Sequence, residues 1–389
     1  MTQDNKDFDK WILSSKSNGC YIFCKSKLLN DLNFIRSNLE KNIILAYSYK
    51  TNFYKGLCKT LDELGCLSEV VSPSEVEFTK EYGINPQDII YNGPNKDFLS
   101  IKYVLENNGL VNADSPTDLA LIEKVIDVLP DNIYRVGLRL DLGLIEKTRF
   151  GFSVNSSYFE KAINIIKNNK KIFFDCLHIH YPSRNLKSLS FRLDSLINLV
   201  RSLDDKPKNI DLGGSYTSLL SRDLSEQLNI PKDNLLNSLE IINVFSKKVS
   251  LFGIENIILE PGTAISANSF LLCGKVCAIN EREDQTIVNL NISKMNLGDI
   301  NSQINYPFKV FNINKKFETV EGDEVQEKNY LICGNTCIEK DIFYSGRYSK
   351  INLGDFIVFE GVGSYSFSFD NNFINTPLKV IDLPFEINF

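Results

Sequence analysis

The alternation of short β-branched runs with amphipathic stretches, from about residue 28 to residue 265, constrains the fold more than any other feature of the chain. This pattern is typical of successive strand–helix units around a parallel sheet. Eight runs have the character of strands: Ile43–Tyr49, Leu67–Val71, Asp88–Tyr91, Gly109–Ala113, Tyr134–Leu140, Phe173–His180, Asn209–Leu212 and Asn256–Glu260. Eight strands make a (β/α)₈ barrel of about 250 residues. We therefore predict an α/β fold in which residues 28–265 form a TIM barrel.

The rest of the chain predicts a second domain. After Ala264 the helical period disappears, and short strands separated by Gly, Asn and Asp turns run to the C-terminus. The segment around Tyr21–Cys24 can add a strand to them. We expect residues 266–389, completed by residues 1–27, to form a β-domain.

Composition narrows the function classes. A net charge of −6, a pI near 5.3 and the absence of a Lys/Arg-rich run argue against nucleic acid as a partner. The polar N-terminus, and the lack of any run of some 18 apolar residues, indicate a cytoplasmic protein without a membrane partner. The nine scattered cysteines fit reduced, buried thiols, and their recurrent spacing of four differs from a CxxC zinc site, so no metal is expected.

Polar side chains follow several predicted strands, at the end of a TIM barrel where its chemistry lies. Lys50 ends the first run, where a desolvated amine can form a Schiff base; a lysine reaching out to water is the alternative. His178 and His180 are the only histidines, and they share one face of a strand. Because no third histidine completes a metal site, we expect one to pack beneath a planar cofactor and one to be buried, with a buried core pair as the alternative.

Two further strand ends carry chemical signals. Gly213 and Gly214 follow a strand, where backbone N–H groups can surround a phosphate, or where the chain simply makes a tight turn. Glu260 can hold a pyridine nitrogen protonated, or it can cap a helix or join a salt bridge. A lysine, a histidine, a glycine loop and a glutamate on four different strands form a specific combination.

In this combination the chain resembles the fold-type III pyridoxal 5'-phosphate (PLP) decarboxylases, the alanine racemase-like group with diaminopimelate and ornithine decarboxylases. The resemblance runs from Tyr21 to about Leu383. It implies that Lys50, in the motif Tyr47–Asn52, holds PLP as a Schiff base, that His180 stacks on the ring and that Glu260 pairs with the ring nitrogen. It also implies cofactor contacts from Glu69, Arg149, Ser183, Gly213, Gly214, Ser215, Gly262 and Thr263.

Two more matches lie in the predicted β-domain. The segment Gly334–Asp341 resembles the family's cysteine motif, which implies that Cys337 enters the partner subunit's site and protonates the product carbon. Glu339 and Asp341 are candidate substrate contacts. Gly363–Tyr365 resembles the Gly-Ala-Tyr motif, so Tyr365 is expected to contact the phosphate and the substrate. Because the family shares its sites across a two-fold interface, the resemblance implies a homodimer.

Departures from the family pattern bear on cofactor and substrate. Thr263 stands where an arginine usually binds phosphate, and Ser215 replaces a third glycine. Ile338 replaces the acidic residue that holds a distal amine, although Glu339 can serve from the next position. The segment Ser183–Leu186 is similar to that of secondary-metabolism members in siderophore and antibiotic pathways, which process modified or conjugated amino acids.

The expected function is PLP-dependent decarboxylation of an amino acid, or of a modified or conjugated one, at Cα. The alternatives are diaminopimelate decarboxylase itself, a PLP-dependent racemase and a non-catalytic regulatory relative. Racemases of this fold usually place an arginine at the ring nitrogen, so Glu260 favours decarboxylation. Retention of Lys50, His180, Glu260, Cys337 and Tyr365 argues against a regulatory role.

Overall fold

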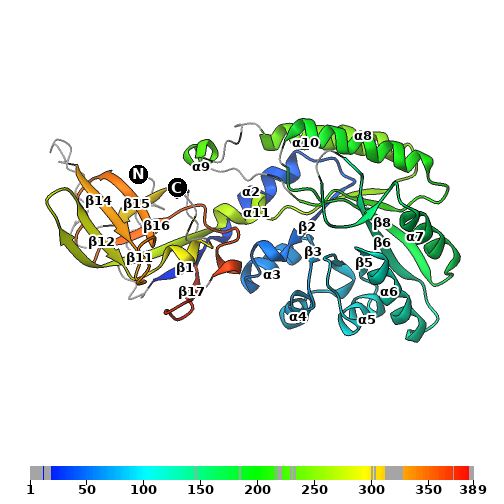
Figure 1. Cartoon of the computed structure of the whole chain (residues 1–389), viewed down its shortest axis with the longest axis horizontal. Coiled ribbons are helices and arrows are strands. Elements are labelled where there is room, and N and C mark those ends of the chain that lie inside the picture. Colours follow the sequence, from blue (N-terminus) through cyan, green and yellow to red (C-terminus); the bar gives the residue numbers. More distant parts are fainter. Residues whose placement is uncertain are drawn as a thin grey trace. The chain divides into compact units, whose positions relative to one another are not determined.

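The computed structural model describes residues 12, 19–144, 147–183, 185–214, 216, 221–227, 230, 234–298, 301, 304–311, 327–370 and 372–384. The chain divides into two compact units. The first contains Phe34–Thr217 and Asp233–Ala264, and the second contains Met1–Asn33, Ser218–Lys232 and Ile265–Phe389. Figure 1 shows both units and labels many of their helices and strands.

The first unit contains a closed barrel of eight parallel strands. These are β2 (Ile43–Ser48), β3 (Leu67–Val70), β4 (Ile89–Tyr91), β5 (Leu110–Ala113), β6 (Tyr134–Asp141), β8 (Ile172–His178), β9 (Asn209–Asp211) and β10 (Asn256–Leu259). Each strand pairs in parallel with the next in this order, and the pairing of β10 with β2 closes the ring. The short β7 (Phe152–Ser153) is an additional partner of β6. All eight predicted strands are present, and the TIM-barrel prediction is confirmed.

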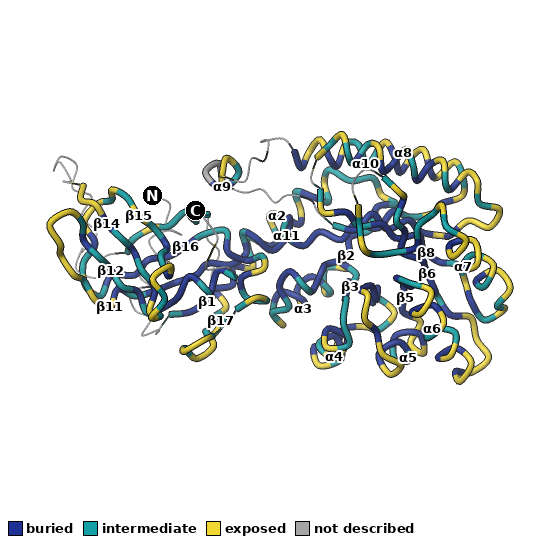
Figure 2. Tube along the Cα trace, viewed as in Figure 1, coloured by how far each residue is buried: buried dark blue, intermediate teal, exposed yellow. Residues whose placement is uncertain are grey.

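Helices connect the strands, and each has a buried and an exposed side, as the burial colours of Figure 2 show. They are α3 (Lys55–Glu63), α4 (Pro73–Tyr82), α5 (Phe98–Glu106), α6 (Pro116–Val128), α7 (Ser157–Asn168), α8 (Leu186–Ser202) and α10 (Asn234–Ser250), with 3-10 turns η1 (Tyr49–Thr51) and η2 (Pro86–Asp88). Ser72 and Ser115 accept backbone N–H groups at the starts of α4 and α6, and a proline follows each serine. These Ser-Pro pairs set where the two helices begin.

The inward faces of the barrel strands change from apolar to polar toward their carboxyl ends. Residues two apart on a strand share a face. Six strands show an apolar residue followed two positions later by a polar one: Ala46 and Ser48, Leu67 and Glu69, Ile90 and Asn92, Leu110 and Asn112, Cys176 and His178, and Ile258 and Glu260. The apolar members pack against one another in the barrel interior. A polar layer therefore lies directly above an apolar one.

The second unit contains an eight-stranded sheet. Its strands are β1 (Cys20–Phe23), β11 (Phe270–Glu281), β12 (Thr286–Leu290), β13 (Phe308–Phe311), β14 (Lys328–Cys333), β15 (Ile342–Tyr348), β16 (Phe356–Phe359) and β17 (Lys379–Asp382). β1 pairs with both β11 and β17, so the predicted completion of the β-domain by an N-terminal strand is confirmed.

Short helices complete the chain: α2 (Lys25–Ser37), α9 (Arg222–Gln227), α11 (Thr263–Ser266), η3 (Ala267–Ser269), η4 (Lys294–Leu297) and η5 (Phe367–Phe369). Among the described helices, none combines the length and the apolar character needed to cross a membrane. Cys20, Cys24 and Cys273 are buried together in the core of the β-domain, in keeping with the apolar runs in which the sequence places them.

Candidate active site

Lys50 lies directly after β2, in the turn η1, and its ammonium group is held from two sides. Its Nζ donates to Ser48 Oγ and to Glu69 Oε2, at 2.6 Å in each case. Glu69 is buried, whereas about a third of the Lys50 side chain (33%) is exposed. Burial alone would raise the pKa of Glu69, but the charge of Lys50 and the hydrogen bonds it accepts hold this pKa below its usual value. The ammonium group is therefore held by two acceptors, on a side chain that is a third exposed.

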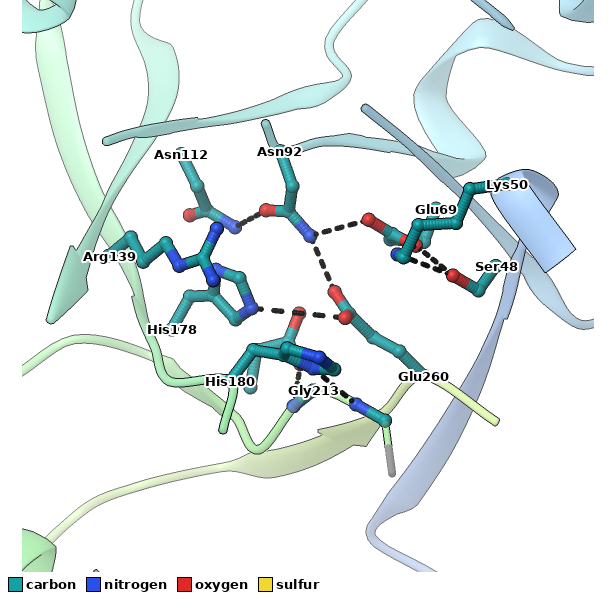
Figure 3. A network of polar contacts seen from close by, with 12 residues as sticks. Ser48, Lys50, Glu69, Asn92, Asn112, Arg139, His178, His180, Gly213 and Glu260 are labelled. Atoms are coloured by element: carbon teal, nitrogen blue, oxygen red, sulfur yellow. Dashed lines mark hydrogen bonds and ion pairs between the residues drawn. The ribbon is translucent and has the colours of Figure 1, made fainter. Parts of the chain in front are cut away.

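A chain of side-chain contacts leads from this lysine across the barrel, as Figure 3 shows. Asn92 follows β4 and donates to Glu69 Oε1 at 3.2 Å and to Glu260 Oε1. Asn112 on β5 donates to Asn92 Oδ1 at 2.8 Å. Strands β2, β3, β4, β5 and β10 thus contribute to one network, although their residues lie far apart in the sequence.

Glu260 is a buried carboxylate with little positive charge near it. Among the described residues only His178 stands within ion-pair range, with 3.8 Å between Nε2 and Glu260 Oε2. Burial, aided by the charge of Arg139, lowers the pKa of His178 well below its usual value, so this histidine is neutral. Burial and the charges of Asp211 and Glu69 raise the pKa of Glu260 well above its usual value. A cationic group from a ligand is the partner that this carboxylate lacks.

Asp211 adds a second buried carboxylate beside Glu260. His178, Asp211 and Glu260 each offer one ligand atom, all within 4.8 Å of one another. The sequence predicted a role for Glu260 at this site, whereas Asp211 was not identified from the sequence. The same cluster of acceptors suits a protonated ring nitrogen.

Asp211 makes a testable contribution to stability. Burial raises its pKa to about 7 from an ordinary 3.8. Because the folded pKa is the higher one, its stabilising effect is complete below about pH 4 and is lost as the pH rises through 7. We expect Asp211→Asn to raise the free energy of unfolding of the cofactor-free protein at pH 8 by up to about 4 kcal/mol, and to have no such effect at pH 4.

Chemical denaturation at pH 8 and pH 4 checks this expectation. Asp127→Asn, at an exposed position of α6, is the control and should leave both values unchanged. Equal gains at both pH values would contradict the assignment of the effect to Asp211 ionisation.

His180 is fixed by the loop that follows β9. Its Nδ1 accepts the Gly214 N–H at 3.0 Å, so the neutral ring carries its proton on Nε2. Burial first, then the charge of Lys50, lowers the pKa of His180 to about 4. A neutral, oriented imidazole is suited to packing against a planar ring.

The two glycines of this loop allow its backbone to lie close to His180 and to Glu260. Gly213 has φ +66°, and a Cβ there would stand 2.6 Å from His180 Nδ1; a Cβ on Gly214 would stand 2.7 Å from the Glu260 carbonyl oxygen. The Gly213 N–H already donates to Asp211 Oδ1 at 2.8 Å, as the Gly214 N–H does to His180. The structure thus gives both N–H groups partners within the protein, and phosphate binding by them stays a prediction. Ser215 lies outside the described residues.

A third glycine approaches the turn that carries Lys50. A Cβ on Gly262 would stand 2.0 Å from Thr51 Oγ1. Thr51 is fully buried, and within the described structure its hydroxyl has no hydrogen-bond partner. Thr263, at the start of α11, is half-buried. The Thr51 hydroxyl is therefore a candidate contact for a ligand that sequence reasoning did not identify.

The two other predicted cofactor residues of the barrel lie less centrally. Arg149 is exposed, with its guanidinium 4.0 Å from the Phe150 ring centre. Ser183 is half-buried, and its Oγ accepts the Asn185 N–H at 3.2 Å beside the start of α8. Arg139 on β6 is the arginine that is drawn within the polar network of Figure 3. It is buried and donates to Asp114 at 3.2 Å.

In the second unit, Asp341 organises the loop that contains Cys337. Its Oδ1 accepts the Lys294 N–H at 2.7 Å, and its Oδ2 accepts from the Thr336 hydroxyl at 2.6 Å. A Cβ on Gly334 would stand 2.3 Å from both carboxylate oxygens. Asp341 is buried and both of its oxygens are engaged within the loop, and its role as a substrate contact stays a prediction.

The remaining predicted residues of the second unit are accessible. Cys337 and Glu339 are exposed in the loop between β14 and β15. Tyr365 has φ +58°, a conformation that non-glycine residues rarely adopt, and its side chain is 37% exposed. Its ring lies 5.6 Å from that of Phe369. Strained backbone of this kind is concentrated at functional sites, so Tyr365 stays a candidate contact.

Sequence reasoning missed several members of the polar layer: Ser48, Asn92, Asn112, Arg139 and Asp211. A signal for them was present, because on most of the strands such a residue lies two positions after an inward-facing apolar one. What the sequence does not show is which of these side chains meet.

The residues present fit PLP. Lys50 offers an amine on a partly exposed side chain, and Glu260 is a buried acceptor beside a neutral histidine. Three glycines leave room for close approach around His180 and Thr51. The fold and this site together define a TIM-barrel protein built to hold PLP.

The chain belongs to the pyridoxal-dependent decarboxylase family, whose pyridoxal binding domain matches residues 26–267. It is 26% identical over 351 residues to a diaminopimelate decarboxylase of Methanocaldococcus jannaschii, covering 86% of this chain and 77% of that protein. The crystal structure of a diaminopimelate decarboxylase from M. jannaschii is similar with a TM-score of 0.76 at 22% identity, over 93% of this chain and 86% of that one. A lysine/ornithine decarboxylase from Vibrio vulnificus, complexed with cadaverine, has a TM-score of 0.77 at 18% identity, over 99% and 100% of the two chains. Both structural similarities concern the fold.

Proposed function

We propose that this protein decarboxylates a modified or conjugated amino acid at Cα and belongs to secondary metabolism. The observation that most supports decarboxylation is Glu260, a buried carboxylate whose one partner in ion-pair range among the described residues is the neutral His178. Such a carboxylate can pair with a protonated ring nitrogen. When bound, PLP supplies an electron sink for the electron pair left by the departing carboxylate, and this sink is strongest with a protonated ring nitrogen.

The chain's own residues have separate tasks in this proposal. Lys50 would hold the cofactor covalently, and Ser48 and Glu69 accept the protons of its ammonium group in the free lysine. His180, fixed by Gly214, would support the ring face. Glu260 would keep the ring nitrogen protonated. Cys337 is the proposed proton donor to Cα, acting in a homodimer across the subunit interface.

The loop after β14 supports a substrate without a free distal amine. The position after Cys337 is occupied by Ile338, which cannot pair with an ammonium group. Asp341 is engaged within the loop, which leaves Glu339 as its remaining exposed carboxylate. Diaminopimelate decarboxylation is the second candidate function, supported by the similarity to the M. jannaschii protein.

A CO₂-release screen separates the two candidates. We expect N-acylated or otherwise conjugated diamino acids to have a kcat/KM at least about tenfold above those of diaminopimelate, lysine and ornithine, because an unpaired charge next to Ile338 is costly. The variant Ile338→Asp should shift this preference toward the free diamines by about 10- to 100-fold, whereas Lys340→Ala, at an exposed position of the same loop, should not. Diaminopimelate as the best substrate of the unmodified protein would overturn the proposal.

The same preparation distinguishes a decarboxylase from a racemase and from a regulatory relative. A racemase would invert Cα without releasing CO₂, which chiral analysis of the product detects. A regulatory relative would give a colourless protein whose spectrum does not change when PLP is added.

A further inference from the structure

Asn92 is the link between the two acidic side chains that flank the barrel's centre. Its Nδ2 donates to Oε1 of Glu69 at 3.2 Å and also to Oε1 of Glu260. Glu69 in turn is the ion-pair partner of Lys50. All three side chains Glu69, Asn92 and Glu260 are at most 2% exposed, so water does not compete for these hydrogen bonds.

The orientation of the Asn92 amide is determined by its surroundings. Turned the other way, its oxygen would face two carboxylates, which is repulsive. In the observed orientation Oδ1 accepts from Asn112 Nδ2 at 2.8 Å, and both N–H groups are left for the two glutamates. Gly137 makes room for this arrangement, because a Cβ there would stand 1.9 Å from Asn112 Oδ1.

We propose that Asn92 is a positioning residue that clamps Glu260 to Glu69 and so keeps Glu260 as a hydrogen-bond acceptor for the cofactor's ring nitrogen, with Asn112 setting the direction of the clamp. This inference rests on the proposed function. Burial, Asp211 and Glu69 all favour a proton on Glu260, and a protonated carboxyl group gives less support to a protonated ring. Two amide donors offset this tendency by stabilising the ionised form of the carboxylates they reach.

The test uses the holoprotein with PLP labelled with ¹⁵N at the ring nitrogen. Asn92→Ala removes both donors, and Asn92→Asp replaces them with a third carboxylate next to Glu69 and Glu260. We expect the ¹⁵N chemical shift to move from the value of a protonated ring nitrogen toward that of an unprotonated one. The change should be larger in the aspartate variant. With the best substrate of the screen, kcat should fall by about 10- to 100-fold while KM changes by less than about threefold.

Two further variants make the result interpretable. Asn112→Leu keeps Asn92 but removes the donor that orients it, so it should shift the ¹⁵N signal in the same direction by a smaller amount. Asn107→Asp, at the exposed end of α5, should change nothing. If the Asn92 variants do not fold, the ¹⁵N signal of the Asn112→Leu variant decides whether the clamp exists.

An unchanged ¹⁵N signal, with kcat within about threefold of the unmodified protein in the Asn92 variants, would overturn the clamp. This outcome differs from failure of the proposed function, in which the unmodified protein itself neither links PLP at Lys50 nor releases CO₂.

Discussion

Lys50→Ala is expected to lower the rate of decarboxylation by at least about 10⁴-fold, because the variant loses the nucleophile that the account assigns to the covalent step. It also leaves Glu69 buried without its cationic partner. The pKa of Glu69, held low by Lys50, should therefore rise, and the variant should be less stable at pH 8 than at pH 5 relative to the unmodified protein. CO₂ release and denaturant unfolding measure the two effects.

Two control variants separate chemistry from charge. Lys50→Arg keeps a cation beside Glu69 and should restore the stability without restoring activity, because a guanidinium does not act as a nucleophile at this pH. Lys80→Ala removes a surface ion pair with Glu77 and should retain both the activity and the stability of the unmodified protein. An active Lys50→Arg variant would contradict the role given to Lys50.

Glu260→Gln is expected to lower kcat by about 10²- to 10³-fold while it stabilises the cofactor-free protein at pH 8. The amide has the same shape as the carboxylate but cannot hold a ring nitrogen protonated. In the cofactor-free protein the replacement removes a buried charge that lies beside Asp211 and Glu69, and whose pKa is raised by that position. Loss of activity with a gain in stability is the signature of a residue kept for function.

Parallel measurements of kcat and of the melting temperature test this pattern. Glu75→Gln replaces another mostly buried glutamate, which accepts the Val71 N–H at 2.7 Å and has no contact with Glu260 among the described residues. Glu75→Gln should leave kcat within a few-fold of the value for the unmodified protein. A Glu260→Gln variant that retains full activity would contradict the assignment of the ring nitrogen to this residue.

The fold was largely predictable because its signal is local. Each barrel strand is a short apolar run, and each Ser-Pro pair marks a helix start within a few residues. The lysine, histidine and glutamate at strand ends were predictable for the same reason, since a TIM barrel presents all its strand ends at one face.

The partners within the site were not predictable, because they depend on closure of the ring. Asn92 meets Glu260 across 168 positions of the sequence, and Asn112 meets Asn92 only because β4 and β5 pair in register. For Asp341 the sequence suggested a role but not the contacts that the residue makes. Its position in a motif suggested substrate binding, but the hydrogen bonds from Lys294 and Thr336 that engage it are tertiary features.

Reduction of the PLP-loaded protein with borohydride, followed by peptide mass mapping, tests the central claim most directly. We expect a pyridoxyl phosphate group on Lys50 and none on Lys80 or Lys96, the latter being buried in an ion pair with Asp118. A holoprotein whose peptide around residue 50 stays unmodified would contradict it.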